Sequence, residues 1–335
     1  MLEKKAARAG LGLALLSSAA FGTSGTFARA LIDAGWSPAA AVTVRISIAA
    51  LILAIPGILS LRGRWHVLRR NLGMIAIYGL VAIAGCQVFY FNAVQHLSVG
   101  VALLLEYMGI ILVVGWLWFR SGRAPRRLTI AGSVASVIGL VLVLDLVGDT
   151  QIDLVGVLWG LGAAVGLAVF FVLSARSDSE LPPLAMASGG MTIGAVTLIV
   201  LGAVGVLPMQ ANTDDVVLAG RQVSWLVPVL GLSVVAAAFA YVVGISAARK
   251  LGSKLASFVG LTEILFAVLF AWLFLGQLPT VIQLLGGLLI VAGVALVRID
   301  ELREPGSDAD FLSGEAAPGE PIEGSRAAAD DAPGR

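Results

Sequence analysis

Charged residues are scarce in this chain of 335 residues, where Asp, Glu, Lys and Arg together make up only 13%. An ordinary soluble domain carries about 25% charged residues, so this scarcity argues against a soluble globular protein. A net charge of +1 gives no basis for nucleic-acid binding. The single cysteine, Cys86, excludes an intrachain disulfide and has no metal-ligating partner at a useful spacing, so we interpret it as a small residue of the apolar core.

Catalytic signatures are lacking as well. The sequence contains no HExxH zinc motif, no GxSxG nucleophile elbow and no Walker loop for the phosphates of ATP. The two histidines, His66 and His96, fall in or near opposite predicted loops. We therefore expect no enzyme activity, no cofactor, no metal centre and no self-contained ATP-driven pump.

Long apolar runs are what the sequence has in abundance. Hydrophobic residues make up 59% of the chain and gather in runs such as 128–144 and 255–275, each close to the roughly 20 residues that a helix needs to cross a bilayer. The first run, from about Ala9 to Phe27, is long enough to span and indicates an uncleaved helix rather than a signal peptide. We predict ten spans, at about 10–32, 39–61, 71–93, 98–119, 128–146, 153–175, 183–206, 224–247, 254–275 and 281–298.

The basic residues predict how these spans are oriented. If the amino terminus is cytoplasmic and the loops alternate, nearly all basic residues fall on the inner side, as the positive-inside rule requires. The inner residues are Lys4, Lys5, Arg8, Arg62, Arg64, Arg69, Arg70, Arg120, Arg123, Arg126, Arg127, Arg176, Arg249, Lys250, Lys254, Arg298 and Arg303. The outer segments hold Arg29, Arg221, Asp149, Asp153, Asp214 and Asp215. We predict a multi-pass protein of a bacterial plasma membrane with both termini in the cytoplasm.

The chain also resembles itself. A shift of 154 residues aligns 93–143 with the second half without a gap, and its landmark matches are Trp118 with Trp272, Pro125 with Pro279, Gly132 with Gly286 and Gly139 with Gly293. A unit of five spans is odd in number, so the second copy enters the membrane inverted. We predict an all-α integral membrane protein of two inverted-topology five-helix repeats, 10–147 and 153–299, after a cytoplasmic segment 1–9. The tail, 300–335, has few large hydrophobic residues and is expected to be disordered.

Three ionisable residues lie inside the predicted spans: Arg45, Glu106 and Glu263. A charge at that depth costs roughly 2.5–3.5 kcal/mol on insertion scales, so each is a candidate for substrate binding or ion coupling. Arg45 and Glu106 lie about 10–12 Å below the outer surface, where we expect them to share a polar cavity at a distance that allows an ion pair. Glu263 is the approximate image of Glu106 in the second repeat. The structural alternative is a carboxylate that is locked to an arginine or caps a helix.

Other polar side chains are weaker candidates for lining the same cavity. They are Gln87, Tyr90 and Asn92 on the third span, Tyr107 on the fourth, and Tyr241 and Ser246 on the eighth.

One segment carries a family resemblance. Residues 89–109, FYFNAVQHLSVGVALLLEYMG, are similar to the junction of the third and fourth spans in bacterial threonine and homoserine exporters, where a glutamate-aromatic-x-Gly motif recurs. Residues 261–264 and 271–277 resemble the Glu-Pro and Gly-Glu elements of the ninth span, and Arg45 matches an arginine common in the second. Over about 10–299 the chain therefore resembles the drug/metabolite transporter superfamily, in the form with two EamA-type repeats.

The resemblance implies a secondary transporter for a small polar metabolite, embedded in the lipid bilayer as a monomer or homodimer. Two departures from the family pattern stand out. Ile110 and Ile264 occupy positions where the family usually has proline, and Gln277 stands where it usually has glutamate. Without those prolines, the expected kinks of the fourth and ninth spans are predicted to be missing.

The leading hypothesis is export of amino acids or related small metabolites by alternating access, with a buried glutamate as the candidate proton carrier. Arg45 together with Glu106 favours a zwitterionic substrate. A multidrug efflux carrier is the alternative within transport, and it would favour a cavity dominated by aromatic rings and a carboxylate. A membrane receptor or assembly factor without transport activity is the alternative of another class, favoured by a tightly packed repeat interface without a polar cavity.

Overall fold

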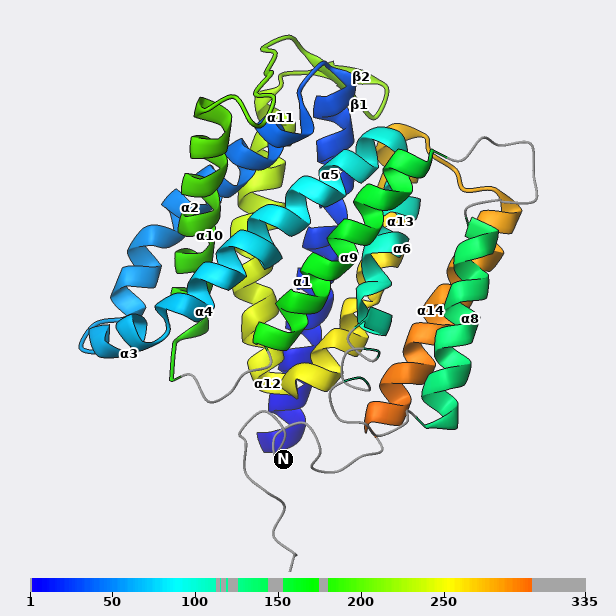
Figure 1. Cartoon of the computed structure of the whole chain (residues 1–335), viewed down its shortest axis with the longest axis horizontal. Helices are drawn as coiled ribbons and strands as arrows, with labels where there is room; N and C mark the ends of the chain where they lie inside the picture. The colour runs from blue at the N-terminus through cyan, green and yellow to red at the C-terminus, as the bar shows by residue number, and fades with distance from the viewer. Residues whose placement is uncertain are drawn as a thin grey trace, which may run out of the picture. The chain divides into compact units, whose positions relative to one another are not determined.

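The computed structural model describes residues 2–112, 115, 119, 126–143, 153–174 and 180–302, and Figure 1 shows the arrangement of its helices. The elements, in chain order, are α1 (Leu2–Asp33), α2 (Pro38–Ser60), α3 (Trp65–Arg70), α4 (Leu72–Ile77), η1 (Tyr78–Gly85), α5 (Cys86–His96), α6 (Val99–Tyr107), α8 (Arg127–Val143), α9 (Leu154–Ser174), α10 (Pro183–Ala203), β1 (Val216–Leu218), β2 (Arg221–Val223), α11 (Leu226–Leu230), η2 (Gly231–Phe239), α12 (Ala240–Gly260), α13 (Thr262–Leu275) and α14 (Val281–Leu302). The tail is expected to be disordered from residue 300, but residues 300–302 continue α14. The rest of the tail falls outside the described residues.

The described residues hold six helices that are long and apolar enough to cross a membrane. They are Ala9–Asp33, Pro38–Ser60, Leu72–His96, Leu154–Ser174, Pro183–Ala203 and Leu226–Ala247. Four shorter apolar helices are Val99–Leu112, Arg127–Leu142, Thr262–Leu275 and Val281–Leu296. Together these segments fall where the sequence predicts its spans, so the protein is a mainly helical, multi-pass membrane protein.

Residues beside the helices explain where several of them begin and end. Helix α2 starts at Pro38, a residue suited to a first helical turn, after Ser37, whose hydroxyl accepts from the amide of Ala40 at 3.2 Å. Ser98 caps α6 in the same way, with its hydroxyl accepting from the amide of Val101 at 3.4 Å. Gly276, with φ at 69°, adopts the left-handed conformation that ends α13.

Helix packing follows a reciprocal pattern. Helix α8 packs along α14 and α2 packs along α10 (Figure 1). Helix α1 contacts η2, α12 and α13, while α9 makes the corresponding contacts with η1, α5 and α6. The α8–α14 contact is reciprocal in detail, because Gly139 abuts the backbone of Gly286 and Gly293 abuts that of Gly132. The same four glycines form the two pairs that match at the 154-residue shift, Gly132 with Gly286 and Gly139 with Gly293, so each glycine contacts the match of the other.

Four interruptions of the regular α-helix lie at corresponding places in the two halves of the sequence. The π-helices η1 and η2 end at Gly85 and Phe239, which are 154 residues apart. Helix α6 is interrupted by a turn at Met108, and α12 and α13 are separated by a turn at Leu261. The prediction that the fourth and ninth spans lose their kinks was therefore wrong. The breaks form without proline, through tight turns in which amides such as that of Ile264 bond the carbonyl three residues earlier, at 3.2 Å.

Two further details differ from the sequence expectations. The predicted connection before 254 is helical, because α12 continues to Gly260 and the break lies at Leu261. The fold is also not purely α, since β1 and β2 pair as a short antiparallel hairpin between α10 and α11, with Val216 opposite Val223. Ala219, with φ at 53°, and Gly220, with φ at 70°, supply the left-handed turn that a two-residue hairpin needs. An apolar pattern of spans carries no signal for this hairpin, which lies in a polar connection.

Candidate functional site

Arg45 lies at the centre of the candidate site. It projects from α2, is only 2% exposed, and donates hydrogen bonds to three other segments of the chain. Its guanidinium bonds the hydroxyl of Ser24 on α1 at 2.8 Å, the side-chain oxygen of Gln87 on α5, and the carbonyl oxygen of Ala236 in η2 at 2.7 Å. Its charge also lies 5.6 Å from the centre of the Phe91 ring. A buried charge is tolerated only when its donors are satisfied, and these contacts supply that compensation.

The π-helices position two of the predicted site residues. Gln87 follows η1 by one residue beyond Cys86, and Tyr241 follows η2 by one residue beyond Ala240. The two residues are therefore equivalent at the 154-residue shift. π-helical turns are frequent at functional sites, so a π-helix next to the site in each half of the chain indicates that this region is functional.

Glu106 lies on α6, is 6% exposed, and accepts a hydrogen bond from Cys86. The sulfur of Cys86 is 3.2 Å from the carboxylate oxygen Oε1 of Glu106 and 3.5 Å from the carbonyl oxygen of Ala163 on α9. Cys86 is buried, as predicted, yet it is more than an apolar filler. Its contact with Glu106 was missed because a thiol in an apolar run gives no local signal of its partner.

Glu263 lies in the first turn of α13 and is contacted from the first half of the chain by Tyr107. The Tyr107 hydroxyl is 3.1 Å from Oε2 of Glu263 and 3.0 Å from the carbonyl oxygen of Gly260, the last residue of α12. Glu106 and Tyr107 are neighbours on α6, so consecutive residues bring the two carboxylates into one region.

The ion pair envisaged between Arg45 and Glu106 is not formed. In the described part of the chain, Arg29 forms an ion pair with Asp33, and His96 forms one with Asp153 when its imidazole is protonated. Arg45 instead interacts electrostatically with Glu106 and Glu263 at longer range. Two consecutive residues of α5 contact the two groups: Cys86 forms a hydrogen bond with Glu106, and Gln87 forms one with Arg45.

The remaining candidates divide into two groups. Tyr90 and Tyr241 are buried among aromatic rings: Tyr90 lies 5.9 Å from Phe91, and Tyr241 lies 5.0 Å from Phe21, measured between ring centres. Both also interact electrostatically with Arg45, which places them in the same region. Asn92 and Ser246 instead bond carbonyls one turn back on their own helices, at 2.7 Å each, which is a local role.

A pocket of about 610 Å³ lies at another place, between the end of α1, the β-hairpin and the end of α13. Its lining includes Asp33, Asp215 and Gln277, and none of the nine predicted site residues belongs to it. Gln277 connects it to α6, since its side-chain oxygen accepts from the amide of Val99 at 3.3 Å. Glu106 lies seven residues further along α6, about 10 Å away along the helix axis.

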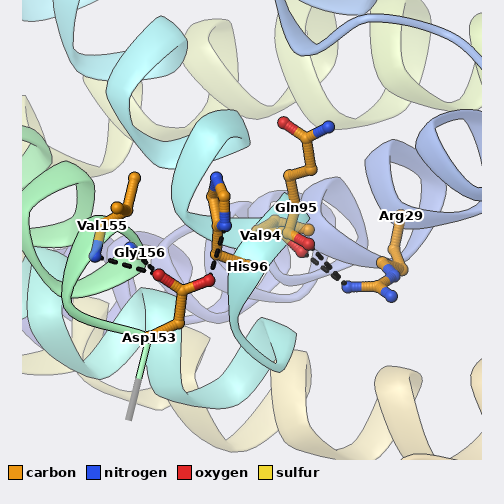
Figure 2. A network of polar contacts seen from close by, with 7 residues as sticks. All are labelled: Arg29, Val94, Gln95, His96, Asp153, Val155 and Gly156. Carbon is orange, nitrogen blue, oxygen red and sulfur yellow. Dashed lines mark hydrogen bonds and ion pairs between the residues drawn. The ribbon is translucent and has the colours of Figure 1, made fainter.

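A second polar network joins the ends of α1 and α5 to the start of α9 (Figure 2). Arg29 donates to the carbonyl oxygen of Val94 at 2.8 Å, and His96 pairs with Asp153 at 2.7 Å. The second oxygen of Asp153 accepts from the first amides of α9, those of Val155 at 2.9 Å and Gly156 at 3.2 Å (Figure 2). The Gly156 amide and His96 hold the pKa of the Asp153 carboxyl below its ordinary value.

No group of three or more metal-ligating side chains occurs among the described residues. The site consists of a buried cation, Arg45, a buried carboxyl group, Glu106, a half-buried carboxyl group, Glu263, and several hydroxyl and amide groups. This set can bind a small polar molecule, or hold and release a proton.

Comparison with known proteins gives these features a context. The pattern of the EamA-like transporter family matches the chain twice, over residues 8–145 and 154–299. An uncharacterized transporter of Archaeoglobus fulgidus is 27% identical over 227 residues, which are 68% of this chain and 76% of that protein. The threonine/homoserine exporter RhtA of Salmonella typhimurium (strain SL1344) is 27% identical over 234 residues, 69% of this chain and 72% of the exporter. A solved crystal structure shares the fold, with a TM-score of 0.58 at 20% identity over 90% of this chain and 99% of its own.

Proposed function

The chain belongs to the EamA-like transporter family, and on that premise we propose that it is a secondary transporter that exports amino acids or related small polar metabolites by alternating access. The observation that carries this proposal is the buried polar site. Arg45, Glu106 and Glu263 lie inside an otherwise apolar bundle, and both matched regions contribute to it. Ionisable groups at such depth are costly and mark transport pathways in membrane proteins.

We further propose that the family repeats form ten spans in inverted topology, 10–147 and 153–299, with both termini in the cytoplasm. The alternation of basic and acidic loops supports this arrangement. So do the reciprocal helix contacts and the exchanged glycine contacts between α8 and α14, because a two-fold axis in the membrane plane generates such pairs.

The charges at the site favour a zwitterion. An amino acid carries a carboxylate, which a guanidinium binds well, and an ammonium group, which a carboxylate binds. Arg45 and Glu106 supply these two partners without pairing with each other, so a bound substrate can lie between them. The similarity to a threonine/homoserine exporter supports the same substrate class.

Access to the site requires movement. With Arg45 2% and Glu106 6% exposed, a substrate in water does not reach either group in this conformation. In the proposed cycle, the Arg45 bonds to Gln87 and to Ala236 are exchanged for bonds to the substrate carboxylate. Glu106 and Glu263 are the groups that take up and release a proton as the site opens to one side and then to the other.

A flux assay in proteoliposomes tests the function. Purified protein should exchange labelled small amino acids, and Glu106→Gln should insert normally yet reduce net flux by roughly tenfold or more, since one lost charged contact is worth that much. Glu180→Gln, at an exposed carboxylate between α9 and α10, is the matched control and should retain flux. Flux of hydrophobic cations alone would favour multidrug efflux, and no flux by folded protein would favour a receptor or assembly factor.

A further inference from the structure

Two of the hydrogen bonds of Tyr107 connect distant parts of the sequence. It is 3% exposed, and its hydroxyl lies 3.1 Å from Oε2 of Glu263 and 3.0 Å from the carbonyl oxygen of Gly260. Tyr107 lies in the first matched region, whereas both acceptors lie in the second. One side chain therefore bridges the two regions next to the turns that interrupt the fourth and ninth spans.

The chemistry of the phenol makes its two acceptors compete. A tyrosine hydroxyl has one hydrogen, so it donates a full bond to only one acceptor at a time. An ionised Glu263 is the stronger acceptor, because hydrogen bonds to a charged group are roughly twice as strong as neutral ones. A protonated Glu263 becomes a donor itself and can donate to the Tyr107 oxygen, which turns the phenolic hydrogen toward Gly260.

A hydrogen bond from Tyr107 to the Gly260 carbonyl has a structural effect. Gly260 is the last residue of α12, and the last four carbonyl groups of a helix have no partner within the helix. The break at Leu261 follows at once, and Glu263 stands in the first turn of α13. A hydrogen bond to Gly260 therefore caps α12, whereas a bond to Glu263 holds the start of α13.

We propose that Tyr107 is a positioning residue that ties the two repeats together at the α12–α13 break and changes its acceptor when Glu263 gains or loses a proton. When Glu263 is protonated, Tyr107 donates to the Gly260 carbonyl and stabilises the end of α12. When Glu263 is ionised, Tyr107 donates to the carboxylate instead, and the end of α12 loses this hydrogen bond and opens more often. The proposal rests on the proposed transport function, in which the proton reaches Glu263 from the aqueous phase during the cycle.

The other charged groups around Glu263 set the conditions for this exchange. Helix α6 presents Glu106 as well as Tyr107, and α2 presents Arg45. Helix α1, which also packs on α13, presents the hydroxyl of Ser18, 3.4 Å from the Val259 carbonyl. Helix α5 adds the thiol of Cys86 and the phenol of Tyr90, which also interact electrostatically with Glu263. The described titratable groups of α1, Arg29 and Asp33, pair with each other at its opposite end.

Hydrogen–deuterium exchange tests the proposal without a transport substrate. Full-length protein in nanodiscs is labelled from pH 5 to pH 9, and rates are corrected for intrinsic exchange. In the wild type, the amides at the end of α12 should exchange roughly tenfold faster once Glu263 is ionised, since one hydrogen bond is lost from the cap. Tyr107→Phe should exchange fast at every pH, and Glu263→Gln should remain slow at every pH.

Tyr241→Phe is the matched control and should keep the wild-type pH step, because the ring of Tyr241 packs on Phe21 and Phe170 and its electrostatic neighbours are Arg45, Tyr78, Cys86 and Glu106 rather than Glu263. A pH step that persists in either Tyr107→Phe or Glu263→Gln overturns the proposal, and so does the absence of a step in the wild type. Two independent variants keep the test valid if one of them folds poorly. If only the Tyr107 proposal is wrong, the exchange pattern is absent but proteoliposomes still show flux. If only the proposed transport function is wrong, flux is absent but the exchange pattern is still observed.

Discussion

The thiol of Cys86 donates to Oε1 of Glu106 across 3.2 Å, so the only cysteine of the chain contacts a carboxylate at the candidate site. At 3% exposure the thiol is closed to water in this conformation. The sequence predicts Cys86 to be a small residue of the apolar core, but its position allows thiol labelling to report whether the site is accessible to water.

Maleimide labelling exploits this position. We expect Cys86 to react slowly in the resting protein and faster when a transported substrate drives the cycle, because only an opened site admits the reagent. Transport should be inhibited as labelling proceeds. Cys86→Ser keeps a donor for Glu106 and should transport in the presence of the reagent, and fast labelling of resting protein would contradict the buried position.

Arg45 should not tolerate replacement by lysine. Arg45→Lys keeps the charge but loses the planar fork that reaches Gln87, Ser24 and Ala236 together. We expect thermal unfolding to show a loss of about 1.5–3 kcal/mol and flux to fall by roughly tenfold or more. Ser24→Ala removes one acceptor only and should have the smaller effect, so equal stability of Arg45→Lys and wild type would exclude this account of the contacts.

Packing between α8 and α14 depends on Gly139. A Cβ added there would lie 2.6 Å from the carbonyl oxygen of Gly286, which is backbone and has little room to move. Gly139→Ala should therefore destabilise the protein by about 1–3 kcal/mol, the typical cost of overpacking. Gly73, on α4, has open space around its Cβ position, and Gly73→Ala should be neutral or stabilising in the same melting assay.

The Asp153 network gives a pH prediction with a definite sign. The Gly156 amide and His96 lower the pKa of Asp153 in the folded protein, so the ionised carboxylate stabilises the fold. That contribution is present above the ordinary Asp pKa of about 3.9 and is lost as pH falls through the lower folded value. The melting temperatures of wild type and Asp153→Asn should differ at pH 6 and converge at the acid end, and a constant difference would assign the effect to packing.

Reporter fusions test the proposed orientation. Fusions after Arg70 and after Arg127 should report cytoplasm, whereas a fusion near Asp214 should report the exterior. Because α12 continues as helix to Gly260, a fusion at Lys250 interrupts an element and is a poorer choice than these sites. An exterior signal after Arg70 or Arg127 would contradict the inverted repeats.

The sequence by itself determined the class of this protein and the position of its helices. Bilayer thickness imposes a minimum length on every spanning helix, and the absence of water inside the bilayer makes each charge there conspicuous. Apolar runs therefore located the helices, and Arg45, Glu106 and Glu263 stood out from their surroundings. The landmark glycines and the motif around Glu106 were enough to indicate the family.

Only the tertiary structure decided which groups meet. The partners of Arg45 come from α1, α5 and η2, and the Tyr107 acceptors lie more than 150 residues away in the chain, so no local pattern encodes these contacts. The breaks at Met108 and Leu261 also form without proline. At Leu261, Tyr107 and Ser18 on neighbouring helices bond the carbonyl oxygens of Gly260 and Val259, which the break exposes. Residue type fixes how costly a buried polar group is, whereas the arrangement of the helices decides what compensates it.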